Sequence, residues 1–199
     1  APLYPRSIVS REVNNTIRSV YPDLFAVRTT DFVANPTSWQ YPIPIDAERI
    51  LAVEYRWDTL SGWQPIVDWE LIQGASTTDF PTGKFLSILT PMPVAAKIHV
   101  TYSAMPSLMT GPDEPFSSTG LPASSRDVVV LGTAARLLPW ADTGRVQVQS
   151  VPSDAMDATK PIGAAVSLAR ELRTAYAARL ASERKALFEK YPTRSHRVR

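Results

Sequence analysis

Apolar residues along this chain recur with two different periods, and the period changes twice. Near the N-terminus the spacing is three or four residues, which predicts an amphipathic helix over residues 8–20. Ser7 is its expected N-cap, and Pro22 forces its end. The apolar positions of this helix are Val9, Val13, Ile17 and Val20.

Between residues 24 and 102 the period is two, which is typical of strands with one buried face. The run "RILAVEYRW" alternates in this way, and a "DTLSG" turn separates it from "WQPIVDWELI", so the two runs predict a hairpin. "KIHVTYS" also alternates, "FLSIL" is a short apolar run, and "LFAVRTTDFV" and "WQYPIPI" are weaker strand candidates. Five to seven short strands with prolines at their ends predict a small antiparallel β-sandwich or barrel.

The helical period returns after a loop rich in Pro, Ser and Gly. Ser124 and Asp127 resemble a capping box at the start of a second helix, which we expect to end before Pro139. A second loop follows, with a short extended piece at "RVQVQS". The longest helix is predicted over residues 162–190, and its apolar stripe is Ala165, Leu168, Leu172, Tyr176 and Leu180.

The order of these elements predicts an α+β fold in which an antiparallel β-domain is inserted into a small helical bundle. The last helix would be about 40 Å long, more than the core of such a domain needs, so we expect part of it to pack on something else. The predicted parts are a bundle from residues 1–22 and 123–190, a β-domain at 24–105, a linker at 106–122 and a basic tail at 191–199.

The formal net charge of +2 is unevenly distributed. Residues 170–199 hold nine Lys or Arg and three Asp or Glu, a net charge of +6, whereas residues 1–169 hold twelve and sixteen, a net charge of −4. An acidic or polyanionic partner is therefore expected at the C-terminal end. The tail residues Lys190, Arg194, His196, Arg197 and Arg199 could bind DNA without sequence preference, could order against a partner protein, or could simply be disordered and solubilising.

Composition and spacing point to few candidate catalytic or metal-binding residues. The chain has no cysteine, so disulfides, thiolate catalysis and zinc–thiolate sites are excluded, and we expect neither metal nor cofactor. His99 and His196 are 97 residues apart, and His99 falls on the polar face of a strand, where a solvent-facing or hydrogen-bonded role is favoured. Asp68 and Glu70 have the spacing of a carboxylate pair on one strand face, but a solvated face is the favoured interpretation. We therefore expect that the protein is not an enzyme.

Tryptophans and one glycine are the remaining candidates. Trp57, Trp63 and Trp69 all lie in the predicted hairpin, where exposed rings could stack on sugars or bases. Their phase matches the apolar alternation, which favours core packing or a subunit contact. Gly132 inside "LGTAARLL" indicates a close approach between helices rather than a phosphate-binding loop. Neither a membrane-spanning segment nor a secretion signal is visible, so we expect a soluble protein made in the cytoplasm.

Four stretches together resemble the head-to-tail connector, or adaptor, proteins of tailed bacteriophages. They are "SWQYPIPIDAERILAVEYRWDTLSGWQPIVDWEL", "FLSILTPMPVAAKIHVTYSAMPS", "LPASSRDVVVLGTAARLL" and "ARELRTAYAARLASERKALFEKYPTRSHRVR", and the resemblance covers roughly residues 35–199. Such proteins form a ring, usually of twelve copies, beneath the portal vertex of the capsid. They share a helical bundle, some with a β-domain inserted after the first helix, and their C-terminal segment reaches into or between portal subunits.

The resemblance implies a noncatalytic assembly role in the neck of the virion. The ring would join the portal to a stopper or tail protein, with double-stranded DNA passing through without sequence recognition and with no membrane contact. A carbohydrate-binding module and a nonspecific DNA-binding protein are the alternatives. The residues that the resemblance assigns to portal docking are Leu187 and Phe188 as apolar anchors, with Lys190, Tyr191, Pro192, Arg194, His196, Arg197 and Arg199 beside them.

Overall fold

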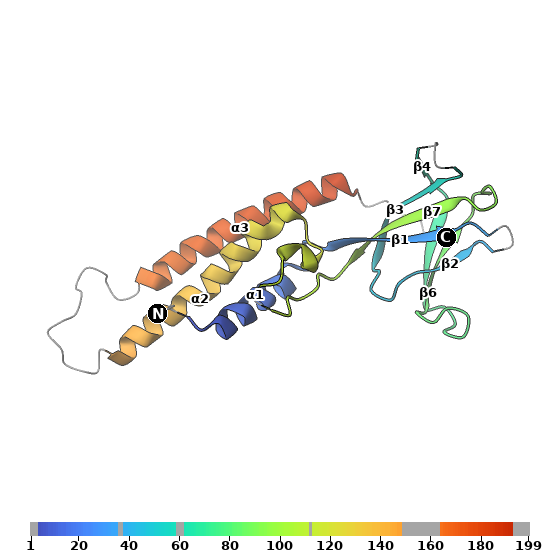
Figure 1. The fold of residues 1–199 in the computed structure, drawn as a ribbon. Coiled ribbons are helices and arrows are strands. Elements are labelled where there is room, and N and C mark those ends of the chain that lie inside the picture. The colour runs from blue at the N-terminus through green and yellow to red at the C-terminus, as the bar shows by residue number, and fades with distance from the viewer. Residues whose placement is uncertain (1–3, 36–37, 59–61, 112, 149–163, 193–199) are drawn as a thin grey trace. The chain divides into compact units, whose positions relative to one another are not determined.

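The computed structural model describes residues 4–35, 38–58, 62–111, 113–148 and 164–192, and the side chains of 141–148, 164 and 165 lie outside the description. The fold is α+β, as the sequence predicts, with three α-helices, a long last helix and two antiparallel sheets (Figure 1). The chain divides into two compact units. The helical unit comprises residues 1–25 and 106–187, and the β unit comprises residues 26–105 and 188–199.

The helical unit is built on α1 (Arg6–Val20), α2 (Arg126–Val148) and α3 (Ala164–Lys190, whose last residues belong to the β unit). These helices meet at Gly132, as the sequence predicts. A Cβ atom on Gly132 would lie 2.6 Å from Cγ2 of Thr16 in α1 and 2.9 Å from Cε2 of Tyr176 in α3. Real Cβ atoms essentially never come so close to another heavy atom. Glycine therefore allows the three helices to come together at this level.

Two predicted helix boundaries are wrong. Helix α1 begins at Arg6 with Pro5 as its N-cap, and the predicted cap Ser7 lies inside the first turn. The carbonyl oxygen of Pro5 accepts hydrogen bonds from the backbone N–H groups of the residues three and four positions on, which closes this turn without a side-chain cap. Helix α2 continues through Pro139 to Val148 instead of ending before the proline.

The continuation of α2 has a simple physical reason. A proline in a helix removes one backbone hydrogen bond and crowds the preceding turn, which bends or weakens a helix without necessarily ending it. The extended piece predicted at "RVQVQS" is consequently helical as far as Val148. At the other end, α2 follows a 3₁₀ turn at Ala123–Ser125, so the predicted capping residue Ser124 precedes the helix by two positions. Its hydroxyl donates to Glu183 instead.

Helix α3 has 27 residues and its bounds match the prediction closely, but its buried face is rotated from the predicted stripe. Leu168 is exposed, while Leu172, Tyr176 and Leu180 are only partly buried. The side chain of Ala165 lies outside the described residues. Along the described part of the helix, the buried positions are Ala169, Glu183 and Leu187.

The predicted linker at 106–122 packs with the helical unit. Thr119 and Leu121 are buried, and residues Phe116–Thr119 form a 3₁₀ turn. The side chain of Asn14 in α1 makes two hydrogen bonds with the backbone of Met109: its Nδ2 donates to the carbonyl oxygen, and its Oδ1 accepts from the N–H, both at 2.9 Å. This segment is therefore a fixed part of the helical unit.

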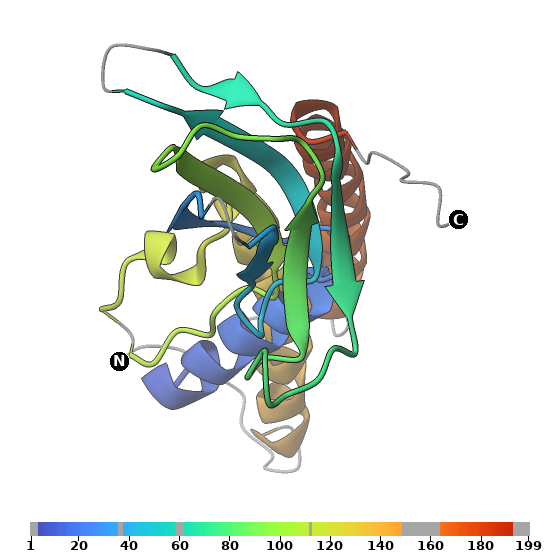
Figure 2. The same cartoon turned by 90° about the vertical axis from the view of Figure 1, so that its right-hand side faces the viewer.

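The β unit has seven strands in two antiparallel sheets, which do not form a closed barrel (Figure 2). The four-stranded sheet has the order β1-β7-β3-β4, and the three-stranded sheet has the order β2-β6-β5. The strands are β1 (Ala26–Val33), β2 (Gln40–Pro42), β3 (Arg49–Arg56), β4 (Gln64–Pro65), β5 (Trp69–Gln73), β6 (Lys84–Ile88) and β7 (Lys97–Ala104).

One hydrophobic core is shared by the two sheets. Ile98, Val100 and Tyr102 of β7 are buried in it, as the alternation of this strand predicts, and Leu86 and Ile88 of β6 contribute from the other sheet. The predicted hairpin is only partly formed. Strands β3 and β4 pair over two register positions, and the following "WELI" belongs to β5 in the second sheet.

Candidate functional site

The predicted portal-docking residues begin in the last turn of α3. Leu187 is buried (6% exposed) and Phe188 is half-buried, whereas Lys190 and Pro192 are exposed. The ammonium group of Lys190 lies 5.4 Å from the ring centroid of the half-buried Tyr191, a cation–π contact. As Leu187 already contributes to packing within the chain, its predicted role as an anchor requires the end of α3 to open. Arg194, His196, Arg197 and Arg199 lie outside the described residues, so the role of the tail stays a prediction.

Polar contacts fix the C-terminal half of α3 inside the helical unit. The carboxylate of Glu183, which is 8% exposed, accepts a hydrogen bond of 2.6 Å from Ser124 Oγ and pairs with Arg179 Nη2 at 2.8 Å. The same Arg179 nitrogen lies 4.0 Å from Asp127 Oδ2. The next residue, Arg184, pairs through Nη1 with Asp23 Oδ1 at 3.1 Å. These contacts tie α3 to the start of α2 and to the segment after α1.

The opposite face of α3 is open in this single chain. Helical spacing of three or four residues places a row of small exposed side chains along this face. The apolar residues Val166 and Leu168 are also exposed, near the start of the helix. The row of small residues, called the open face below, consists of Ala175, Ala178, Ser182 and Ala186.

The three tryptophans of the predicted hairpin have different environments. Trp69 is 7% exposed and lies in the core of the β unit, which confirms core packing for this residue. Trp57 and Trp63 are 51% and 39% exposed, so core packing is wrong for them. A subunit or ligand contact through these two rings stays a prediction.

Trp63 contacts two side chains, Arg56 and His99, of the four-stranded sheet. The guanidinium carbon of Arg56 lies 4.7 Å from its ring centroid, and the ring of His99 lies 5.2 Å away. His99 Nδ1 is 2.6 Å from Oδ1 of Asp31, the residue opposite it in the β1–β7 register. His99 is thus hydrogen-bonded on the polar face, as predicted. Asp31 is largely exposed, so water screens this pair.

The predicted carboxylate pair does not converge with other functional groups. Asp68 and Glu70 are both exposed, with Trp69 buried between them. Only Glu70 lies within β5, since Asp68 precedes the strand. The favoured interpretation of a solvated strand face is therefore confirmed for these two residues.

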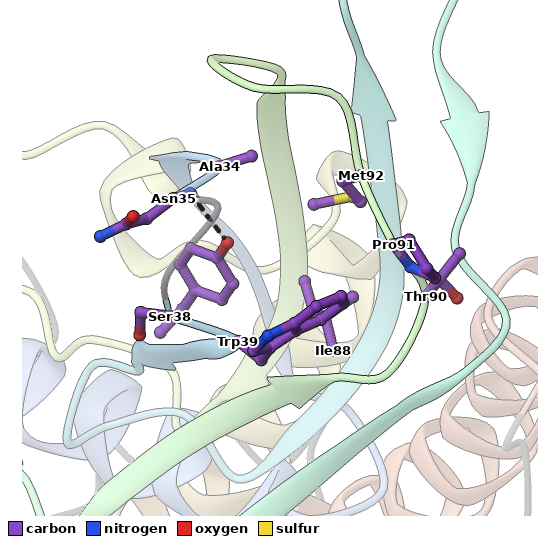
Figure 3. A pocket seen from close by; sticks show the side chains of 9 residues that line it. Ala34, Asn35, Ser38, Trp39, Ile88, Thr90, Pro91 and Met92 are labelled. Atoms are coloured by element: carbon purple, nitrogen blue, oxygen red, sulfur yellow. Dashed lines mark hydrogen bonds between the residues drawn. The ribbon is translucent and has the colours of Figure 1, made fainter.

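A cavity that the sequence analysis did not identify opens in the β unit. It has a volume of about 210 Å³ and lies between the end of β1, the start of β2 and the segment after β6. Trp39 and Met92 face it, whereas the side chains of Asn35 and Ser38 point away (Figure 3). A signal was available, because two segments that border it, 33–39 and 88–96, contain no charged residue. The lining residues are Ala34, Asn35, Ser38, Trp39, Tyr41, Ile88, Thr90, Pro91 and Met92.

Within the described ranges, no three His, Cys, Asp or Glu side chains are grouped so that they could hold a metal ion. Among the same residues, no helix is long and apolar enough to cross a membrane.

Neither a protein-family model nor a curated protein matches the chain.

Proposed function

We propose that this protein is a noncatalytic structural component of a tailed-bacteriophage virion. Made in the cytoplasm of the bacterial host, it forms a ring in the neck, between the portal and the stopper or tail protein, and extends the channel through which double-stranded DNA passes. Twelve copies is the number that the resemblance to connector proteins implies. The role rests on that resemblance and on one structural observation, the open face of α3.

Helix α3 exposes more surface than its own unit uses. At 1.5 Å per residue, its 27 residues extend about 40 Å. One side is anchored through Glu183, Arg184 and Leu187, while the open face carries small side chains from Ala175 to Ala186, and Glu171 and Glu189 continue the same row at its two ends. Small side chains allow another backbone to approach closely. A neighbouring copy that packs there with a different surface makes a heterologous contact, which produces a closed ring when the rotation between copies is suitable.

The charge distribution supports a partner at the C-terminal end. Net positive charge accumulates over residues 170–199, and a basic segment attracts acidic surfaces over a distance of about one Debye length, roughly 8 Å at physiological salt. In the proposed arrangement this segment docks on the portal. Phe188 and Tyr191 then contribute apolar contact area, and the arginines of residues 193–199 contribute ionic contacts.

The decisive experiment tests the open face directly. Ala178→Glu, in the middle of this face, places a long charged side chain where a neighbouring helix would pack. We expect it to abolish the ring-sized species in sedimentation velocity and electron microscopy, with or without added portal rings, while the thermal unfolding temperature stays unchanged. The matched control is Thr78→Glu, which adds the same charge at an exposed position of the β unit. Normal rings from the Ala178→Glu variant would overturn the assignment of this face.

Portal docking is tested separately by deleting residues 191–199. The truncated chain should fold and should form rings, but it should fail to bind purified portal. If it still joins the portal with the affinity of the full chain, the docking role of the tail is wrong.

Carbohydrate binding is the second candidate, because Trp57 and Trp63 are exposed. Exposed indole rings stack on sugars as readily as they pack against protein. Binding of bacterial surface oligosaccharides, measured by calorimetry and abolished by Trp57→Ala with the fold intact, would favour this function. Rings that bind portal but no sugar would exclude it.

A further inference from the structure

We propose that the free edge of strand β1 pairs with the same edge of a second copy of this chain, so that two four-stranded sheets join into one sheet of eight strands. The contact lies wholly within the β unit. It uses neither the open face of α3 nor the C-terminal tail, so it is independent of the proposed function.

Strand β1 has one hydrogen-bonding edge without a partner strand. It is the terminal strand of its sheet, with β7 on the other side (Figure 1). Ala34, which continues β1, donates its N–H to the carbonyl oxygen of Ala96 at 2.7 Å, so even-numbered residues direct their backbone groups towards β7 and odd-numbered residues direct theirs outward. Among the described residues, no hydrogen bond reaches this outward row. The row, called the β1 edge below, consists of Val27, Thr29, Asp31 and Val33.

The usual protections against edge-to-edge pairing are missing from β1. The strand is eight residues long, contains neither proline nor glycine, and pairs with β7 without a bulge. Both of its charged side chains are already engaged within the chain. Asp31 Oδ1 lies 2.6 Å from His99 Nδ1, and Arg28 Nη1 lies 2.6 Å from an oxygen of Asp46. The β1 edge is therefore a regular template for another strand.

The sequence of β1 is complementary to itself in one antiparallel register. The two-fold axis of this register passes between Thr30 and its copy. Val27 then faces Val33 of the second copy, and Thr29 faces Asp31. All four edge residues form hydrogen-bonded pairs, and two bonds for each pair give about eight in total. Val33, which is 63% exposed in the single chain, gains an apolar neighbour.

Other registers of the same kind fit less well. A shift by two residues in one direction places Asp31 directly opposite its own copy, where like charges are destabilising. A shift by two in the other direction places Val27 opposite Asp31 and leaves Val33 without a facing residue. The register centred on Thr30 pairs the whole β1 edge and keeps the two aspartates from facing each other.

Pairing through β1 also ends at two copies. The joined sheet would have the order β4-β3-β7-β1-β1-β7-β3-β4, with β4 at both ends. Strand β4 has only two residues, and one of them is Pro65, which has no N–H to donate. A strand of another protein could use the same backbone groups, but the match between the two ends of β1 favours a second copy. Since a two-fold contact cannot repeat between neighbours of one cyclic ring, the pair is a form in solution distinct from the ring.

Cysteine cross-linking tests the register, because the chain has no cysteine of its own. Thr30→Cys places two thiols opposite each other on the axis, at a separation that a disulfide spans. Thr29→Cys is the matched control: position 29 is more exposed, but its two copies are diagonal neighbours about 7–8 Å apart. Both variants carry Ala178→Glu, so that the open face of α3 does not contribute. Thr30→Cys should form covalent dimers at least tenfold faster, and equal rates would overturn the proposal.

Sedimentation equilibrium of the full chain with Ala178→Glu tests the contact itself. Thr29→Pro removes an N–H that β7 does not use, so the far-UV spectrum should stay unchanged while the dimer dissociation constant rises at least tenfold. Thr29→Ala keeps this N–H and is the control, with the dissociation constant unchanged. Val33→Lys leaves the backbone intact and places a charge against Val27 at both ends of the contact, so it should also weaken the dimer at least tenfold.

Three results would contradict the pairing. The first is a chain that stays monomeric throughout the micromolar range. The second is a dimer that neither Thr29→Pro nor Val33→Lys weakens. The third is a monomer that binds the portal or the stopper protein and loses this binding in both variants, which would assign the β1 edge to a different protein.

Discussion

Gly132 in α2 and Tyr176 in α3 are so close that the Cβ atom the glycine lacks would lie 2.9 Å from the Tyr176 ring. Gly132→Ala must therefore displace a ring on one helix and Thr16 on another. Overpacking of this kind costs about 1–3 kcal/mol, and urea unfolding should show a loss of stability in this range. Gly111→Ala is the matched control in the helical unit, because no atom lies within 4 Å of the Cβ it adds. Equal stability of the two variants would contradict the close contact.

The buried carboxylate of Glu183 should contribute strongly to the stability of the helical unit. Glu183→Ala removes the partner of both Ser124 and Arg179. Hydrogen bonds to charged groups contribute roughly 1.5–3 kcal/mol, so we expect a destabilisation of about 2 kcal/mol in chemical denaturation. Glu171→Ala, at an exposed position of the same helix, should change the free energy of unfolding by less than about 0.5 kcal/mol. A Glu183→Ala variant as stable as this control would show that the contacts contribute little.

Glu114 should give the helical unit an acid-sensitive loop. A hydrogen bond from Ser118, followed by bonds from the backbone and side chain of Thr110, lowers the pKa of this carboxyl from 4.5 to about 2. Since the folded pKa is below the unfolded one, the contribution to stability is complete above about pH 4.5 and is lost as the pH falls towards 2. Carboxyl NMR titration should show the pKa of Glu114 rising in Ser118→Ala. A titration curve unchanged by this substitution would assign the shift to another cause.

The tryptophans should separate into core and surface residues when each is replaced by alanine. Trp69→Ala leaves a void in the core of the β unit and should cost about 3–5 kcal/mol. Trp57→Ala and Trp63→Ala remove exposed rings and should each cost much less, because most of the area they lose is already hydrated. Thermal unfolding of the three variants measures this order. If Trp63→Ala is as damaging as Trp69→Ala, the contacts of Trp63 with Arg56 and His99 are a major source of stability.

The sequence predicts the classes of the elements well because the periods of two and 3.6 differ clearly. In β7, Ile98, Val100 and Tyr102 alternate with polar residues and are buried as the pattern indicates, although Thr101 and Ser103 of the polar face are buried as well. Gly132 is predicted equally well, since a lone glycine in a helix has few other roles. The end of α2 is predicted wrongly. A proline weakens a helix because it removes one backbone hydrogen bond, but the surrounding contacts decide whether the helix continues.

The two uncharged segments are visible in the sequence, but that they come together around a cavity could not be derived from local pattern. Its walls come from residues 34–41 and 88–92, which are about 50 positions apart in the chain and meet only because β6 pairs with β2 and β7 pairs with β1. The exposure of Trp57 could not be predicted from the pattern for a related reason. Alternation shows which face of β3 a side chain takes, but it does not show where the opposing sheet ends.

The register of β1 and β7 has a consequence for how such a chain can evolve and be engineered. Ala26 pairs with Ala104, so the first and last residues of the β insertion face each other across the ladder, about 5 Å apart. Residues 26–104 can therefore be exchanged at this point without separating the two ends of the chain that flank them. Replacing residues 26–104 by a short glycine-rich turn should leave a three-helix protein that can be studied alone.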